Sequence, residues 1–388
     1  MTAGTARRSR RLLSGFAACL ALAAIVVCPS PAYAKGCEAE SRDDPMPQTP
    51  WPLERMRPER MWPLTRGEDM KVAVIDSGVG EHPILKGRVK AVDYTEDKLG
   101  ARCDMASHGT LVAGIIAGAD TSDSPFHGLA PDASILSYRV IDTVESATSR
   151  DAVVPVVDAI RDAVDKGADV INLSLTSVHT TALQEAIEYA HRKDVVVVAA
   201  AGNSGAEGRK SYPAAYDTVI AVAGLRPNGE HVESSSIGDY VDIAAPGEQI
   251  DGPAPSGGGY GRREKGGTSF AAPYVSATAA LLKSYYPKDS PEETAARMLV
   301  TADHPPGGRN QLVGYGELNP YRALTTVLTA AEKREAITPD APQQASDPGA
   351  VTRKRALLFT ACAAALVLVF LAAKVIVPRG RNRRWRCP

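Results

Sequence analysis

The chain has 388 residues, of which 44% are hydrophobic and 23% charged, and its formal net charge is -1. That balance hides a division, because residues 1–34 and 351–388 carry four and nine basic residues and no acidic ones, whereas the segment between them carries 31 basic and 45 acidic residues. A body of that charge has no electrostatic footprint for nucleic acid, so we expect no nucleic-acid partner.

The first 34 residues have the pattern of a secretory signal peptide. Four arginines within residues 7–11 precede an apolar run over 12–27, and the small residues Ala32 and Ala34, on either side of Tyr33, form a cleavage motif. Such a segment directs export and is removed afterwards. The arginines leave open whether export follows the general or the twin-arginine route.

Residues 35–66 form a proline-rich extension. Six prolines leave little room for regular structure there. Two cysteines remain in the exported body, Cys37 and Cys103, and in an oxidising compartment they most simply pair. Two independent buried thiols are the alternative. A bond would add about 4 kcal/mol in the chain-entropy model and would favour an extension that wraps the body over one that is cleaved off.

Between residues 67 and 330, short apolar segments alternate with segments of helical periodicity. The apolar segments are β-branched and nearly continuous, as buried parallel strands are. Alternation of this kind predicts βαβ crossovers and a three-layer α/β/α sandwich around a mostly parallel sheet. The expected strands are 71–76, 134–141, 168–175, 194–202 and 218–224, and the expected helices are 108–118, 153–167, 182–194 and one from 269 to about 286.

The C-terminal part divides into a linker at 331–355, an apolar run at 356–377 and a basic tail at 378–388. The run has about the length that a helix needs to cross a hydrocarbon layer of roughly 30 Å. A buried core helix is the alternative, but basic residues on both sides of the run argue against it. We therefore expect one transmembrane helix, an extracytoplasmic body and a cytoplasmic tail, which is type I topology in the cell membrane.

Three polar residues mark strand ends or helix starts. Asp76 ends an expected strand, while His108 and Ser269 each open an expected helix. Functional groups gather at the carboxyl ends of parallel strands. A serine hydroxyl is a nucleophile only when a base removes its proton, and an imidazole base needs a carboxylate to fix its tautomer. The three residues predict a catalytic triad.

Asn203, just past an expected strand, is the candidate side-chain donor to an oxyanion. Gly266 and Gly267 precede the serine, and we expect them to let a substrate backbone approach it. Taken singly, each polar residue has an ordinary structural explanation, as a turn aspartate, a helix cap or a loop asparagine. Occurring together in this order, they favour catalysis.

The sequence resembles the subtilisin-like serine proteases. The motifs that carry the resemblance are "VAVIDSGV", "HGTLVAGIIAG" and "GTSFAAPYVSA", in the family's order of aspartate, histidine and serine. The resemblance implies a subtilisin-like fold, a triad of Asp76, His108 and Ser269, and Asn203 as oxyanion donor. It also implies walls that bind an extended peptide, formed by Ser174, Leu175, Thr176, Ala199, Ala200, Ala201 and Gly202. We expect no cofactor and no bound metal.

Within that family, the layout is similar to the mycosins, membrane-anchored proteases of type VII secretion systems. The shared features are the signal peptide, the proline-rich extension, the expected Cys37–Cys103 bond, the linker, the single span and the short basic tail. The resemblance implies a serine endopeptidase with a protein or peptide substrate and a membrane secretion complex as partner. The alternative is a mainly structural component of such a complex, with proteolysis secondary. The sequence identifies neither the substrate nor the particular secretion system.

Overall fold

The structure is a computed structural model, and it describes residues 36–143, 149, 151–205, 208–329, 332 and 350–382. The expected signal peptide at 1–34 lies outside these residues, as does most of the expected linker at 331–355. The last six residues of the basic tail also lie outside them.

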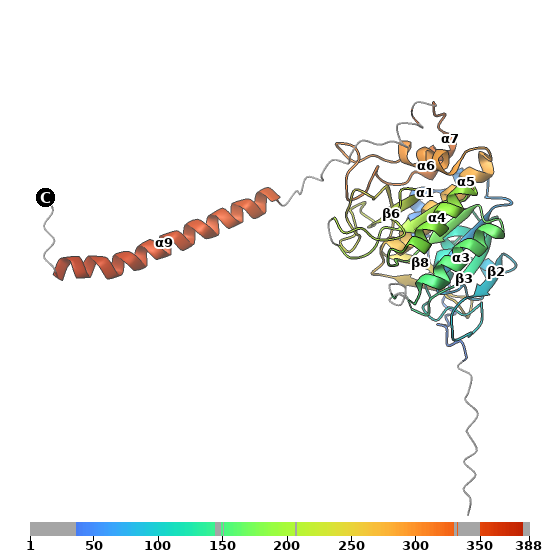
Figure 1. Ribbon diagram of the computed structural model, residues 1–388, viewed down its shortest axis with the longest axis horizontal. Coiled ribbons are helices and arrows are strands. Elements are labelled where there is room, and N and C mark those ends of the chain that lie inside the picture. The colour runs from blue at the N-terminus through green and yellow to red at the C-terminus, as the bar shows by residue number, and fades with distance from the viewer. Residues whose placement is uncertain are drawn as a thin grey trace, which may run out of the picture. The chain divides into compact units, whose positions relative to one another are not determined.

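A seven-stranded sheet, parallel throughout, runs through the body in the order β2-β3-β1-β4-β5-β6-β7 (Figure 1). The strands are β1 (Lys71–Asp76), β2 (Val89–Asp93), β3 (Ser134–Arg139), β4 (Val170–Leu173), β5 (Val196–Ala200), β6 (Val219–Leu225) and β7 (Ile243–Pro246). All five expected strands are present. The sequence pattern misses the two outer strands, β2 and β7. In β2, most positions are only half-buried.

Helices cover both faces of the sheet, as a three-layer sandwich requires. Along β1, Val72 and Val74 pack into one core cluster with α2 (Gly109–Ala117) and α5 (Thr268–Tyr285), while Ala73 and Ile75 pack into another with α3 (Val153–Asp165) and α4 (Thr181–Arg192). This alternation follows from the two-residue period of a strand. Further helices in the described residues are α1 (Trp51–Met56), α6 (Pro291–Val300), α7 (Pro320–Thr325), α9 (Ala350–Asn382) and the 3-10 turns at Pro58–Arg60 and Pro83–Leu85.

The proline-rich extension is held to the body covalently and by main-chain pairing. Cys37 and Cys103 form a disulfide. The N–H of Gly259 donates to the carbonyl of Arg42 (2.7 Å), and that of Tyr260 donates to the carbonyl of Asp44 (2.9 Å). These contacts tie the extension to an antiparallel hairpin, β8 (Ile250–Pro253) and β9 (Tyr260–Arg263), in a segment that the sequence left without assigned structure.

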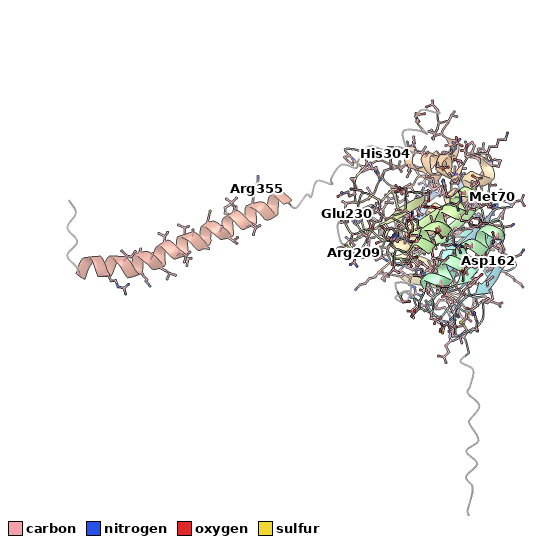
Figure 2. All side chains as sticks on the ribbon, in the orientation of Figure 1. Met70, Asp162, Arg209, Glu230, His304 and Arg355 are labelled. Atoms are coloured by element: carbon pink, nitrogen blue, oxygen red, sulfur yellow. A yellow bond between two sulfur atoms is a disulfide. The ribbon has the colours of Figure 1, made fainter. Side chains whose placement is uncertain are left out.

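The C-terminal helix α9 contains the expected span at 356–377. Its apolar stretch, Arg355–Lys374, has a mean hydropathy of 2.6, and none of it is buried. Figure 2 labels Arg355 at the start of that stretch. The helix is therefore long and apolar enough to be a candidate membrane span.

Candidate functional site

The polar residues singled out in the sequence gather at the carboxyl edge of the sheet. Asp76 is the last residue of β1, and Asn203 follows the end of β5 by three residues. His108 immediately precedes α2, and Ser269 is the second residue of α5. Because these strands are parallel, their carboxyl ends lie along one edge, and both helices begin beside it.

Asp76 and His108 are joined by a direct hydrogen bond of 2.7 Å between the carboxylate Oδ1 and the imidazole Nδ1. Asp76 is fully buried, and His108 is 6% exposed. Burial lowers the pKa of His108, but the negative charge and hydrogen bond of Asp76 outweigh that effect, so the pKa of the imidazole is raised above its ordinary value. With Nδ1 donating to the carboxylate, Nε2 is the nitrogen that can accept a proton.

Ser269 is held at the same edge by contacts of its own main chain and of the next residue. Its carbonyl accepts a hydrogen bond from the Ser174 hydroxyl (2.6 Å), and the ring of the next residue, Phe270, lies 5.0 Å from the His108 ring. Among the described residues, the structure contains no hydrogen bond between Ser269 Oγ and His108 Nε2. Hydrogen bonds between nucleophile and base are often long in the absence of substrate.

The side-chain amide of Asn203 is oriented by Thr268. Asn203 Oδ1 accepts hydrogen bonds from the Thr268 N–H (3.0 Å) and the Thr268 hydroxyl (3.1 Å). A main-chain N–H can only donate, so the atom facing it must be the oxygen, and Nδ2 points away. The residue is exposed, and the structure assigns Nδ2 no partner among the residues it describes. Asn203 thus has an N–H group available beside the start of α5.

Gly266 and Gly267 must be glycine for a reason other than the expected approach of a substrate backbone. A Cβ atom on Gly266 would lie 1.7 Å from the Gly247 carbonyl oxygen, and one on Gly267 would lie 2.4 Å from Asn203 Oδ1. Any larger residue would therefore displace main chain or the oriented amide. The glycines are required first for packing of the site itself, whatever space they leave to a substrate.

The expected wall residues lie directly after β4, at the end of the neighbouring strand β5, or directly after β5. Most are buried, and the side chains of Leu175 and Ala199 belong to the core under α3 and α4. Thr176 is half-buried. The Ser174 hydroxyl is bound to Ser269. Thr176 is therefore the expected wall residue that presents the most surface to a peptide.

Sequence reasoning missed a buried polar network beneath the serine. Asn172 Nδ2 donates to Ser174 Oγ (2.9 Å), and the Ser276 hydroxyl donates to Asn172 Oδ1 (2.8 Å). These hydrogen bonds connect β4 to α5, and Ser174 Oγ extends the network by donating to the carbonyl of Ser269. The available signal was a polar residue inside each of two apolar segments, "INLSL" and "VSATAA".

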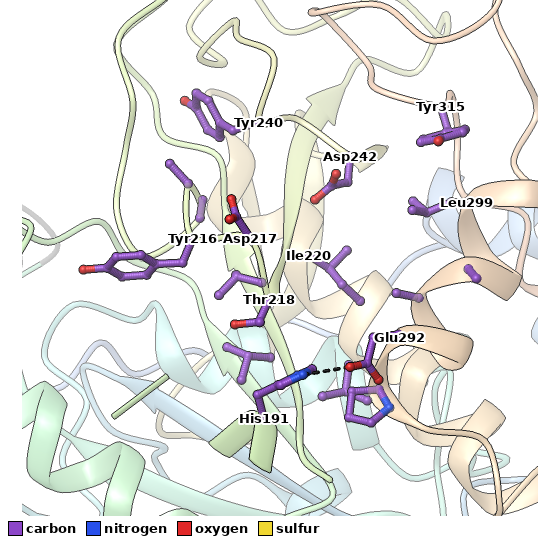
Figure 3. Close-up of a pocket in the computed structure, with 18 of the residues that line it drawn as sticks. His191, Tyr216, Asp217, Thr218, Ile220, Tyr240, Asp242, Glu292, Leu299 and Tyr315 are labelled. Carbon is purple, nitrogen blue, oxygen red and sulfur yellow. Dashed lines mark ion pairs between the residues drawn. The ribbon is translucent and has the colours of Figure 1, made fainter. Parts of the chain in front are cut away.

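A cavity of about 500 Å³ lies at the other edge of the sheet, at the starts of β5 and β6, next to the end of α4 and to α6 (Figure 3). His191 Nε2 and Glu292 form an ion pair of 2.8 Å there. Burial raises the pKa of Asp242 to about 6. None of the expected triad residues lines this cavity. Across the described residues, no group of three or more His, Cys, Asp or Glu side chains is placed to hold a metal ion.

Comparison with known proteins places this geometry in a family. Residues 67–316 match the family described as Peptidase_S8, the subtilase family. Mycosin-4 of Mycobacterium tuberculosis is 35% identical over 373 residues, covering 84% of this chain and 81% of that protein. Thermitase of Thermoactinomyces vulgaris is 36% identical over 273 residues, covering 70% of this chain and 94% of thermitase.

Solved structures agree. MycP1 from Mycobacterium smegmatis matches with a TM-score of 0.67 at 28% identity, covering 81% of this chain and 92% of that one. A chain in the periplasmic assembly from the ESX-5 inner membrane complex also matches with a TM-score of 0.67, at 27% identity and the same coverage. The chain described here belongs to the subtilase family of serine endopeptidases, and its relatives include the mycosins.

Proposed function

We propose that Asp76, His108 and Ser269 form the catalytic triad of this endopeptidase. The observation that carries the proposal is the 2.7 Å bond between His108 Nδ1 and Asp76 Oδ1, at the edge where Ser269 opens α5. The fixed tautomer leaves Nε2 to act as the base. The close packing of Phe270 on the His108 ring brings the serine's own segment of α5 against that base.

In this mechanism, His108 Nε2 takes the hydroxyl proton of Ser269 as Oγ attacks the carbonyl carbon of the scissile peptide bond. The resulting oxyanion is stabilised by Asn203 Nδ2 and by the Ser269 N–H, one of the unpaired N–H groups in the first turn of α5. When the C–N bond breaks, His108 gives its proton to the leaving amine, and an acyl-enzyme remains. A water molecule, deprotonated by the same imidazole, then releases the acid and regenerates Ser269.

The substrate in this proposal is an extended peptide. It lies along residues 174–176 and 199–202, and it pairs with main chain at 174–176 in the manner of an added strand. Thr176, which is half-buried, is the residue of these segments that presents surface to such a peptide.

We further propose that α9 anchors the protein in the cell membrane as a type I, single-pass span, with a removed signal peptide, a retained extension and a cytoplasmic tail. Its apolar stretch has the composition of a span, and basic residues flank it on both sides. The partner in this proposal is a type VII secretion membrane complex, because the similar MycP1 comes from the ESX-1 type VII secretion system and another similar chain belongs to the ESX-5 inner membrane complex.

A structural role in that complex is the second candidate function. It is favoured by one observation, the likeness to a chain that is itself part of a membrane-complex assembly. Such a role needs the folded body and its anchor but not the chemistry of Ser269.

The two roles separate when Ser269→Ala is compared with deletion of the whole chain. If catalysis is the sole function, both changes abolish secretion of the system's substrates to the same extent. If the alanine variant supports secretion and deletion does not, the structural role carries secretion. Equal secretion by wild type, variant and deletion strain would contradict the proposed partnership altogether.

A further inference from the structure

We propose that Asp104, a second buried carboxylate next to the triad, is a positioning residue for the Asp76–His108 pair. The proposal deepens the proposed function and rests on it. Asp104 is fully buried, in the loop between β2 and α2, and directly follows the disulfide-bonded Cys103. No step of the mechanism above uses it.

Four hydrogen bonds converge on this carboxylate. Asp104 Oδ1 accepts from the Ser77 hydroxyl (2.7 Å) and the His108 N–H (3.3 Å), and Oδ2 accepts from the Thr110 N–H (2.8 Å) and the Thr110 hydroxyl (2.6 Å). These donors come from the end of β1 and from the start of α2. Asp104 therefore holds together the two segments that carry the catalytic aspartate and histidine.

The link to Asp76 runs through one hydroxyl. Ser77 Oγ lies 2.7 Å from Asp104 Oδ1 and 3.1 Å from Asp76 Oδ1, and it accepts a hydrogen bond from the Gly109 N–H (3.1 Å). A hydroxyl has a single proton, so the two carboxylates compete for it. The shorter contact gives it to Asp104, which leaves Asp76 Oδ1 to the Ser77 N–H and the His108 imidazole.

The charge of Asp104 also acts on His108. Three charged groups face the imidazole: Asp76 at the end of β1, Asp104 beside the start of α2, and Arg263 on β9. The two carboxylates raise the pKa of His108, and the arginine lowers it. Arg263 is itself held near the histidine, because its guanidinium donates to the Ser107 carbonyl and pairs with Glu40 of the extension.

A purely structural role would give a different result from a positioning role. A residue that only stabilises the start of α2 changes the melting temperature and leaves the titration of the base where it was. A residue that holds the catalytic pair and faces the imidazole with its charge changes the rate of the chemistry and the pH at which the base becomes active.

The test is Asp104→Asn in the full chain, with the rate of labelling by a fluorophosphonate probe followed across pH. An amide can accept at only one of its two polar atoms, so its NH₂ group must face donors, and the pair loses its alignment. We expect labelling to slow by about tenfold to a hundredfold. The labelling rate falls at low pH as the imidazole becomes protonated. We also expect the midpoint of that fall to move to lower pH, because the imidazole loses a nearby negative charge.

The matched control is Asp242→Asn, the same exchange at a carboxylate on the opposite edge of the sheet, which should leave both the rate and the midpoint unchanged. If Asp104→Asn labels as fast as wild type with the same midpoint, the inference is wrong while the triad stands. If wild type is not labelled at any pH, the proposed function is wrong, and the inference that rests on it is wrong as well.

If Asp104→Asn does not fold, Ser77→Ala takes its place, since it removes the shared hydroxyl and leaves both carboxylates. Labelling should then slow by about tenfold, with a melting temperature that shows a folded protein. An unchanged rate in that variant would overturn the inference.

Discussion

The two edges of the central sheet both carry buried or partly buried carboxylates, and we propose that only one of them is arranged for catalysis. At the carboxyl edge, Asp76 bonds to an imidazole whose second nitrogen is left to accept a proton. At the amino edge, Asp242 accepts from the Ala221 N–H (2.9 Å) and lies 3.7 Å from Arg309. A cavity of about 500 Å³ lies at the amino edge, where the imidazole of His191 is bound to Glu292. Both edges thus pair an imidazole with a carboxylate, but the side chains of the pair are 7% and 0% exposed at the carboxyl edge, against 26% and 41% at the amino edge. Ser269 also lies at the start of the adjoining helix α5. We propose the carboxyl edge as the reactive one.

Removing the amide at the carboxyl edge should have the largest effect of the three changes that sharpen this comparison. In Asn203→Ala, turnover of a peptide substrate should fall by about 10² to 10³, because the oxyanion loses one of its donors. The Michaelis constant should change little, since the donor acts on charge that develops in the transition state. If the Michaelis constant rose and turnover stayed the same, Asn203 would be assigned to substrate binding instead.

Opening the disulfide should affect stability more than chemistry. The bond spans a sequence separation of 66 residues, so Cys37→Ser should lower the free energy of unfolding by about 2 to 5 kcal/mol, measured by urea unfolding of the full chain in detergent. The control is Cys362→Ser, which removes an exposed thiol in α9. Equal urea midpoints for Cys37→Ser and Cys362→Ser would show that the disulfide adds nothing to the stability of the body.

At the amino edge, replacing Asp242 should have the smallest effect of the three changes, and it should raise the stability of the fold instead of lowering it. The folded pKa of Asp242 is about 6, against an ordinary value of 3.8. Between these values the unfolded chain loses the proton first, so the stability of the fold decreases as pH rises through that window. Asp242→Asn removes this loss, and at pH 7 the melting temperature should rise by about 2 °C or more, with activity unchanged. A lower melting temperature at pH 7 would contradict the raised pKa.

Some elements of the fold and of the candidate site could be predicted from the sequence, and others could not. Asp76 and His108 could be placed because the end of a buried strand and the start of a helix are both readable locally, and parallel strands bring their ends to one edge. The strand β2 was missed because its half-buried pattern lacks a continuous apolar run. The β8–β9 hairpin was missed because its partner, the extension, lies some 200 residues away in the chain.

The polar support of the site was equally hidden. Asn172 and Ser276 are 104 residues apart, and each is simply a polar residue inside an apolar segment until the fold brings them together. Asp104 has the same character, because its four donors lie on segments whose mutual approach no local pattern describes. The candidate catalytic residues could be named from the sequence, whereas the hydrogen bonds that hold them in place could not.

The most direct test of the central claim is to label the protein with a fluorophosphonate and to map the modified residue by mass spectrometry, in wild type and in Ser269→Ala. The account predicts one label, on Ser269, and none in the variant. A label on another residue, or no label on folded wild-type protein, would contradict the assignment of Asp76, His108 and Ser269 as a catalytic triad.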